Sequence, residues 1–142
     1  MKMFFNLIRR GIAWFIGCVL LLAAIGKLLD NRHFAEVLAK WQLFPNWSLL
    51  PLGAVASLAE LVLAIWLFSG RRLAVAALLS VVFHLGYSGA TMLSLLRGVR
   101  LPDCGCFGIL FSHPLNWTMV VEDFGFAILS LVLYALARKA QQ

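Results

Sequence analysis

Four long runs of apolar residues constrain the fold of this chain more than any other feature. They cover about residues 11–29, 49–68, 73–96 and 117–137. Because an α-helix rises ~1.5 Å per residue, about 20 apolar residues match the ~30 Å hydrocarbon core of a bilayer. Only 13% of the residues are charged, about half the share in a water-soluble domain. The sequence therefore predicts an all-α, integral membrane four-helix bundle that forms a single domain, 1–142.

The first apolar run has two interpretations. It follows Lys2, Arg9 and Arg10, and a basic start before an apolar run is also typical of a cleavable signal peptide. However, the apolar residues continue through residues 19–25 without a convincing small-residue cleavage site. We therefore expect this run to remain as a membrane span.

The segment 31–43 differs from the four runs because its apolar residues form only one stripe. They recur at helical spacing: Phe34, Val37, Leu38 and Trp41. Arg32, Glu36 and Lys40 are interspersed among them, and the segment is too short to cross a bilayer. It predicts an interfacial amphipathic helix. We expect Trp41 and Trp47 to lie at the level of the lipid headgroups.

The basic residues lie beside the ends of the apolar runs, where they orient membrane spans. Seven Lys and Arg residues belong to the end that carries both termini, and five, including Lys27, belong to the other end. This bias favours cytoplasmic termini. The amphipathic helix and the loop 97–116 would then share the outer face, with the side chain of Lys27 reaching outward to the interface. No basic stripe is present that would predict nucleic-acid binding.

Polar residues inside the spans should face the interior of the bundle, because polar groups in hydrocarbon are costly. Two sets recur at helical spacing: Ser80, His84, Tyr87, Thr91 and Ser94 in the third span, and Gly53, Ser57, Glu60 and Ala64 in the second. Hydrogen bonds between helices explain most of them. Glu60, His84 and Asp123 are also candidates for proton handling, whereas the Cys18 thiol should be an inert apolar group in the membrane.

The strongest functional signal is the segment Asp103-Cys104-Gly105-Cys106-Phe107-Gly108. A disulfide across one intervening residue closes a small ring, so we expect it to be easily reduced. Two thiolates would also suit Cu(I) or zinc, with Asp103 or His113 as further ligands, although zinc usually takes four ligands. An unreactive pair of thiols is the third interpretation. Redox exchange at Cys104 and Cys106 is our leading hypothesis, and Asp103 would oppose a thiolate at its neighbour.

Three short stretches together resemble a known family. They are Gly26-Lys27-Leu28, Ala59-Glu60 and Cys104-Gly105-Cys106-Phe107-Gly108, and they look like the MauE family of methylamine-utilisation proteins, within the DoxX-like group of four-helix membrane proteins. The resemblance implies an inner-membrane protein that works beside a periplasmic thioredoxin-like partner while a secreted protein matures. It also implies that Cys104 and Cys106 are the functional pair and that Glu60 is a buried acid.

These observations predict a membrane thiol–disulfide oxidoreductase that exchanges disulfides with a thioredoxin-fold partner or client. A quinone in the bundle, similar to that of vitamin K epoxide reductases, is one electron acceptor to consider, although the Cys-x-x-Cys motif of those enzymes does not occur here. The alternative function is a non-enzymatic membrane assembly subunit or a partner protein that binds copper or zinc. A transporter is disfavoured, because four spans without an internal repeat are unlike the usual transporter architecture.

Overall fold

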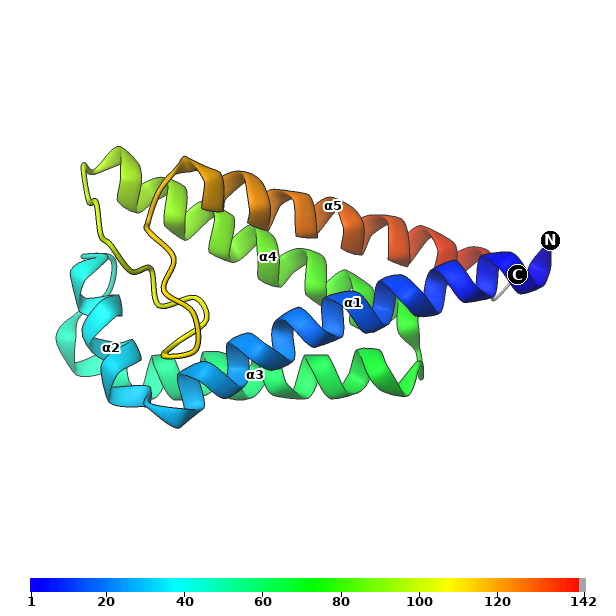
Figure 1. Cartoon of the computed structure of the whole chain (residues 1–142), viewed down its shortest axis with the longest axis horizontal. Coiled ribbons are helices and arrows are strands. Elements are labelled where there is room, and N and C mark those ends of the chain that lie inside the picture. The colour runs from blue at the N-terminus through cyan, green and yellow to red at the C-terminus, as the bar shows by residue number, and fades with distance from the viewer. Residues whose placement is uncertain (141–142) are drawn as a thin grey trace.

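The structure is a computed structural model, which describes residues 1–140, and it is an elongated helical bundle (Figure 1). Its elements are α1 (Lys2–Leu29), α2 (Asn31–Lys40), a 3-10 turn (Asn46–Ser48), α3 (Leu49–Ser69), α4 (Leu73–Leu96) and α5 (Trp117–Lys139). Four of these helices, α1, α3, α4 and α5, are long and apolar enough to cross a membrane. The predicted all-α membrane bundle is therefore confirmed.

The helix bounds agree closely with the sequence-based spans, with three differences. Helix α1 begins at Lys2 and not near residue 11, so Arg9 and Arg10 extend the helix beyond its apolar part. Helix α2 ends at Lys40, and the chain leaves the helix through Gln42, whose φ is 57°. Helix α5 continues to Lys139, because its basic last residues still favour a helix C-terminus.

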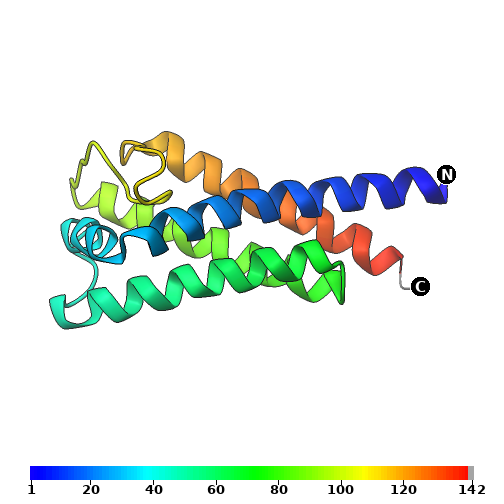
Figure 2. The same ribbon diagram turned by 60° about the horizontal axis from the view of Figure 1, so that its bottom comes forward.

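The spanning helices are arranged as two closely packed pairs, α1 with α3 and α4 with α5. Both termini lie at one end of the bundle, and α2 lies with the cysteine-bearing loop at the opposite end (Figures 1 and 2). The amphipathic helix and the loop therefore share one end, as predicted. The polar faces of α3 and α4 are also buried: Gly53, Ser57, Glu60, Ala64, Ser80, His84, Thr91 and Ser94.

Helix α2 covers the end of the bundle and does not simply rest on the membrane surface. Its apolar stripe packs against the loop and the start of α5, and this cluster contains Phe34, Val37, Leu38, Trp41, Cys104, Leu115 and Met119. Trp41 is only 2% exposed, so our placement of this indole among the lipid headgroups was wrong. Trp41 belongs to the apolar cluster that α2 forms with the loop, whereas Trp47 is 83% exposed.

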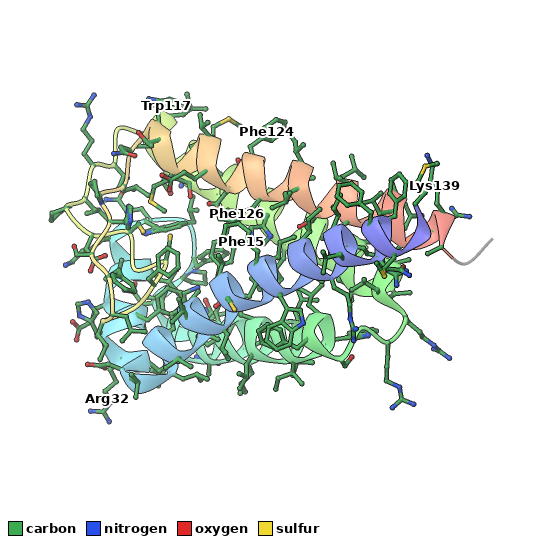
Figure 3. All side chains as sticks on the ribbon, turned by 45° about the vertical axis from the view of Figure 1, so that its right-hand side comes forward. Phe15, Arg32, Trp117, Phe124, Phe126 and Lys139 are labelled. Atoms are coloured by element: carbon green, nitrogen blue, oxygen red, sulfur yellow. The ribbon has the colours of Figure 1, made fainter. Side chains whose placement is uncertain are left out.

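The outer surface of the bundle is apolar along its length, as expected for lipid contact. Figure 3 shows Phe124 pointing away from α5, whereas Phe15 and Phe126 meet between α1 and α5 with their ring centroids 6.1 Å apart. Charged side chains mark the two ends, for example Arg32 and Lys139. Cys18 is exposed on this surface of α1 and does not belong to the core.

The cysteine-bearing loop is fixed to α1 by a contact between two glycines. The backbone N–H of Ile109 donates to the carbonyl oxygen of Gly26 at 3.3 Å. A Cβ atom on Gly26 would collide with the backbone of Phe107, and one on Gly108 would collide with the backbone of Gly26. Gly108 also has a φ of 55°, which side chains disfavour. The loop can therefore lie on α1 only because both positions lack a side chain.

We predict that Gly26→Ala displaces the loop, because the added Cβ atom would force the backbone of the loop away from that of α1. The contacts between the two segments would then be lost. Overpacking of this kind costs about 1–3 kcal/mol, so thermal unfolding should begin at a lower temperature and Cys104 should react faster with a small alkylating reagent. Gly11→Ala in the same helix is the matched control, since a Cβ there meets nothing within 4 Å. Equal behaviour of the two variants would contradict the docking of the loop on α1.

Candidate functional site

The two cysteines lie in one tight turn whose backbone holds one of the sulfurs. Both are free thiols; Cys104 is 0% exposed, and Cys106 is partly exposed. The backbone N–H of Cys106 donates to the Sγ atom of Cys104 at 3.2 Å. The N–H of Cys104 donates to the carbonyl oxygen of His113 at 2.7 Å. The bond to His113 therefore fixes the start of the turn to the end of the loop, and Cys104 is the more deeply buried residue of the pair.

Gly105 is required between the cysteines for two reasons. Its φ is 72°, a left-handed conformation that L side chains rarely adopt. A Cβ atom would also lie 3.0 Å from Val37 and 3.2 Å from Phe34 on α2. The N–H of Gly105 donates to Oδ1 of Asp103 at 3.0 Å, so this carboxylate stabilises the turn. Asp103 therefore contacts the backbone of the turn, and its other oxygen lies 3.7 Å from Nε2 of His33.

The environment makes the two thiols unequal. The pKa of Cys104 is lowered, chiefly because the thiol of Cys106 donates to its sulfur, with help from the Cys106 backbone N–H. The pKa of Cys106 is raised well above its ordinary value, because its proton is held by Cys104 and because it is buried. The thiolate forms first at Cys104. A low thiol pKa also makes a good leaving group in disulfide exchange.

A buried ion pair lies beneath this turn. Nζ of Lys27 donates to Oε1 of Glu60 at 2.6 Å and to the hydroxyl oxygen of Tyr87 at 2.9 Å. The ammonium also lies over the rings of Phe34 and Tyr87, at 5.1 and 4.7 Å from their centroids. Lys27 is 1% exposed, so our expectation that it reaches outward was wrong. An acid, a hydroxyl and two aromatic faces at one depth offset the cost of burying its charge.

Three of the predicted candidates meet Cys106 at one small cavity between α1 and α5. The cavity measures about 70 Å³, and its polar lining consists of Lys27, Glu60, His84, Tyr87, Cys106, Glu122 and Asp123. Oε2 of Glu60 and Oδ2 of Asp123 are buried without a hydrogen-bond partner among the residues that the structure describes. A cavity of this size and polarity suits one or two water molecules. Glu60, His84 and Asp123 are therefore brought together around the inner side of Cys106.

His84 and His113 occupy structural positions in this arrangement. Nδ1 of His84 lies 2.9 Å from the carbonyl oxygen of Ser80, which can only accept, so this nitrogen donates its proton along its own helix. His113 contributes its carbonyl oxygen to the turn and packs its ring against Phe107. Among residues 1–140, no three His, Cys, Asp or Glu side chains gather closely enough to hold a metal ion.

Sequence reasoning missed Lys27 as a member of this site, although a signal was present. Lys27 and Glu60 are opposite charges in two predicted spans, and intramembrane charges usually pair with one another. Placing both at the same end of the bundle would have suggested their contact. The packing of Gly26 against Gly108 had no such signal, because it depends on the path of a loop.

We predict that Lys27→Met destabilises the protein more than Lys27→Met combined with Glu60→Gln. Breaking a buried pair leaves one charge uncompensated and costs about 3–5 kcal/mol, whereas replacing both partners by neutral groups can be nearly neutral. Thermal unfolding in detergent should therefore occur at a lower temperature in the single variant, with Lys40→Met on the exposed face of α2 as the control. A double variant as unstable as the single one would contradict the pairing.

The comparisons with known proteins point to one family. A sequence profile of the family described as methylamine utilisation protein MauE matches residues 1–136. The methylamine utilization protein MauE of Paracoccus denitrificans is 24% identical over 119 residues, covering 84% of this chain and 64% of that protein. The protein of the same name from Methylorubrum extorquens is 30% identical over 122 residues, covering 80% of this chain and 61% of that protein.

The chain thus spans less than two thirds of the length of these two relatives. A third, from Methylophilus methylotrophus, is 32% identical over 92 residues, or 65% of this chain and 48% of that protein. No solved structure matches the chain. Because the family profile extends over nearly all of the sequence, this protein belongs to the MauE family of methylamine-utilisation proteins.

Proposed function

We propose that this protein is a membrane thiol–disulfide exchange protein. Its Cys104 and Cys106 would exchange with a periplasmic thioredoxin-like partner, or with a client, during maturation of a secreted protein. The observation that carries the proposal is the geometry of the turn, in which the N–H of Cys106 lies 3.2 Å from the Sγ of Cys104. A backbone donor aimed at a sulfur stabilises a thiolate there, and the thiolate is the reactive form in disulfide exchange.

The unequal thiols assign a role to each cysteine. Starting from a Cys104–Cys106 disulfide, a partner thiolate attacks the Sγ of Cys106, which is the partly exposed residue of the pair. A bond forms between these two sulfurs, the internal disulfide breaks, and Cys104 leaves as a thiolate that the Cys106 N–H stabilises. The partner's second thiolate then attacks its own sulfur in the mixed disulfide, and Cys106 leaves and takes up a proton. The pair gains two electrons, and the partner dithiol becomes a disulfide.

We further propose that the termini are cytoplasmic and that the turn faces the outer side of the inner membrane. The termini lie together at one end of the bundle and the loop lies at the other. Lys27 is paired inside the bundle, so it no longer counts among the flanking charges. Seven basic residues at the terminal end then oppose four at the loop end, which strengthens the orientation bias. An oxidising outer compartment also suits disulfide chemistry.

We predict that Cys104→Ser traps a mixed disulfide between Cys106 and the partner in cells. Exchange is reversible: in the reverse direction the Sγ of Cys106 attacks the disulfide of an oxidised partner, and Cys104 resolves the mixed disulfide. Loss of Cys104 should therefore let this adduct accumulate, whereas Cys106→Ser should give only background levels. Non-reducing electrophoresis and mass spectrometry of the purified adduct measure this directly. Cys18→Ser is the matched control, because Cys18 lies on the outer surface of α1.

The same strains distinguish exchange from the alternative of a non-enzymatic assembly subunit. Exchange requires both sulfurs, so each Ser variant should lose client maturation while it still accumulates in the membrane to the parental level. Normal client maturation in both variants would contradict exchange and would favour the assembly subunit.

A further inference from the structure

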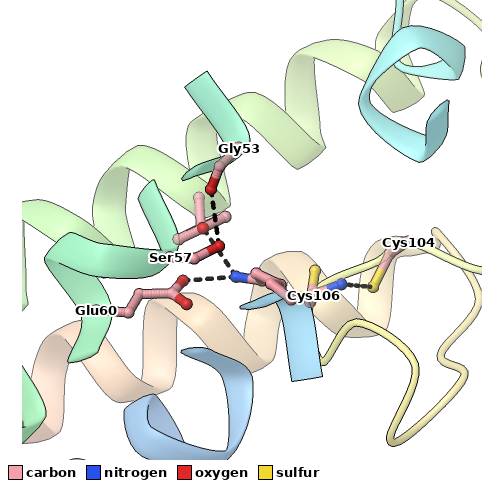
Figure 4. Close-up of polar contacts among 7 residues, drawn as sticks. Gly53, Ser57, Glu60, Cys104 and Cys106 are labelled. Atoms are coloured by element: carbon pink, nitrogen blue, oxygen red, sulfur yellow. Dashed lines mark hydrogen bonds and ion pairs between the residues drawn. The ribbon is translucent and has the colours of Figure 1, made fainter. Parts of the chain in front are cut away.

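The cysteine turn and the buried ion pair are neighbours through consecutive residues of α1. Gly26 accepts the hydrogen bond that fixes the loop, and the next residue, Lys27, lines the same cavity as Cys106. Figure 4 labels Glu60 with the two cysteines, and a dashed line marks the ion pair of its carboxylate. The cation of this ion pair therefore belongs to a residue that shares a cavity with Cys106.

The charge of Lys27 acts in surroundings that screen it weakly. Tyr87 lines both the polar cavity and an apolar groove of about 310 Å³ among α2, α3 and α4, whose walls include Phe34, Trp41 and Phe83. Aromatic and aliphatic walls lower the local dielectric, so a charge there influences a neighbouring group more strongly than it would at a wet surface.

Lys27 is also the counter-charge that a thiolate at this place needs. The titratable groups that face Cys106 come from every element around it: Lys27 of α1, Glu60 of α3, His84 and Tyr87 of α4, Glu122 and Asp123 of α5, and Asp103 and Cys104 of the loop. Of these described residues, Lys27 carries the positive charge, whereas the acids would repel a thiolate.

We propose that Lys27 is a positioning residue that stabilises the thiolate form of the Cys104–Cys106 pair and thereby raises its reduction potential. This inference rests on the proposed thiol–disulfide exchange and adds a direction to it. A pair whose reduced form is stabilised is the stronger oxidant. The partner class is therefore a protein dithiol that gives up two electrons to the Cys104–Cys106 disulfide. Glu60 keeps the ammonium at this place and moderates its charge.

The direction of the electrostatic effect agrees with this role. The positive charge of Lys27 lowers the pKa of both cysteines, although it is a smaller influence than the contact between the two thiols. Removing the charge should therefore raise the pH at which the first thiolate forms. It should also favour the disulfide over the dithiol at equilibrium.

The test compares Lys27→Met/Glu60→Gln with the parent, both carrying Cys18→Ser so that only the pair contributes thiols. In the purified full chain in lipid nanodiscs, thiolate absorbance is measured against pH, and the dithiol–disulfide equilibrium is measured in glutathione buffers. We expect the ionisation midpoint to rise by about one pH unit. We also expect the equilibrium to shift about tenfold towards the disulfide, which equals about 30 mV for this two-electron couple.

Two further variants separate an electrostatic role from a structural one. Arg32→Met removes an exposed cation at the same end of the bundle (Figure 3), and it should leave the midpoint unchanged. Glu60→Gln retains the cation and removes its anion, so the midpoint should fall, opposite to the double variant. This second variant decides the matter if the double variant does not fold. Shifts in the same direction in both, or no shift in a folded variant, would overturn the role of Lys27.

These measurements do not depend on a partner protein, so the two proposals fail separately. If the midpoint shifts as expected but no mixed disulfide forms in cells, the exchange function is wrong and the effect of Lys27 on the thiols stands. If the cysteines exchange in cells and the midpoint is unchanged, exchange stands and the assignment of Lys27 is wrong.

Discussion

The ion pair between Lys27 and Glu60 is the interaction on which the rest of this structure depends. An unpaired charge in hydrocarbon is costly, so the pair fixes the relative depth and rotation of α1 and α3. The bond from Lys27 to Tyr87 extends the same constraint to α4. Polar contacts that the lipid cannot replace thus join three of the four spans at one level.

This constraint also explains why a functional loop lies where it does. With Lys27 turned into the bundle, the preceding residue, Gly26, faces the loop and receives the backbone of Gly108. Three stretches that are far apart in the sequence, around Lys27, Glu60 and the two cysteines, become one physical unit (Figure 4). The electrostatics of the thiols and the packing of the helices therefore have a common origin.

The sequence was sufficient for the features that depend on local pattern. Hydropathy and length located the four spans, and helical spacing located α2 and the buried polar face of α4. It was insufficient where two distant segments meet. Lys27 and Trp41 were each assigned to the interface because each was judged against lipid or water alone, and their partners come from other helices. Whether a charged side chain lies inside the bundle or at the interface depends on whether an oppositely charged partner is beside it. A single sequence shows such a partner only indirectly.

The central claim is that two sulfurs held above a buried cation change their redox state in the living membrane. The most direct measurement is the oxidation state of Cys104 and Cys106 in intact cells, quenched rapidly with acid and read by differential alkylation and mass spectrometry. The account predicts a mixture of dithiol and disulfide that moves towards the dithiol when a reductant reaches the outer face. A pair that stays fully reduced, whatever the external redox conditions, would contradict it.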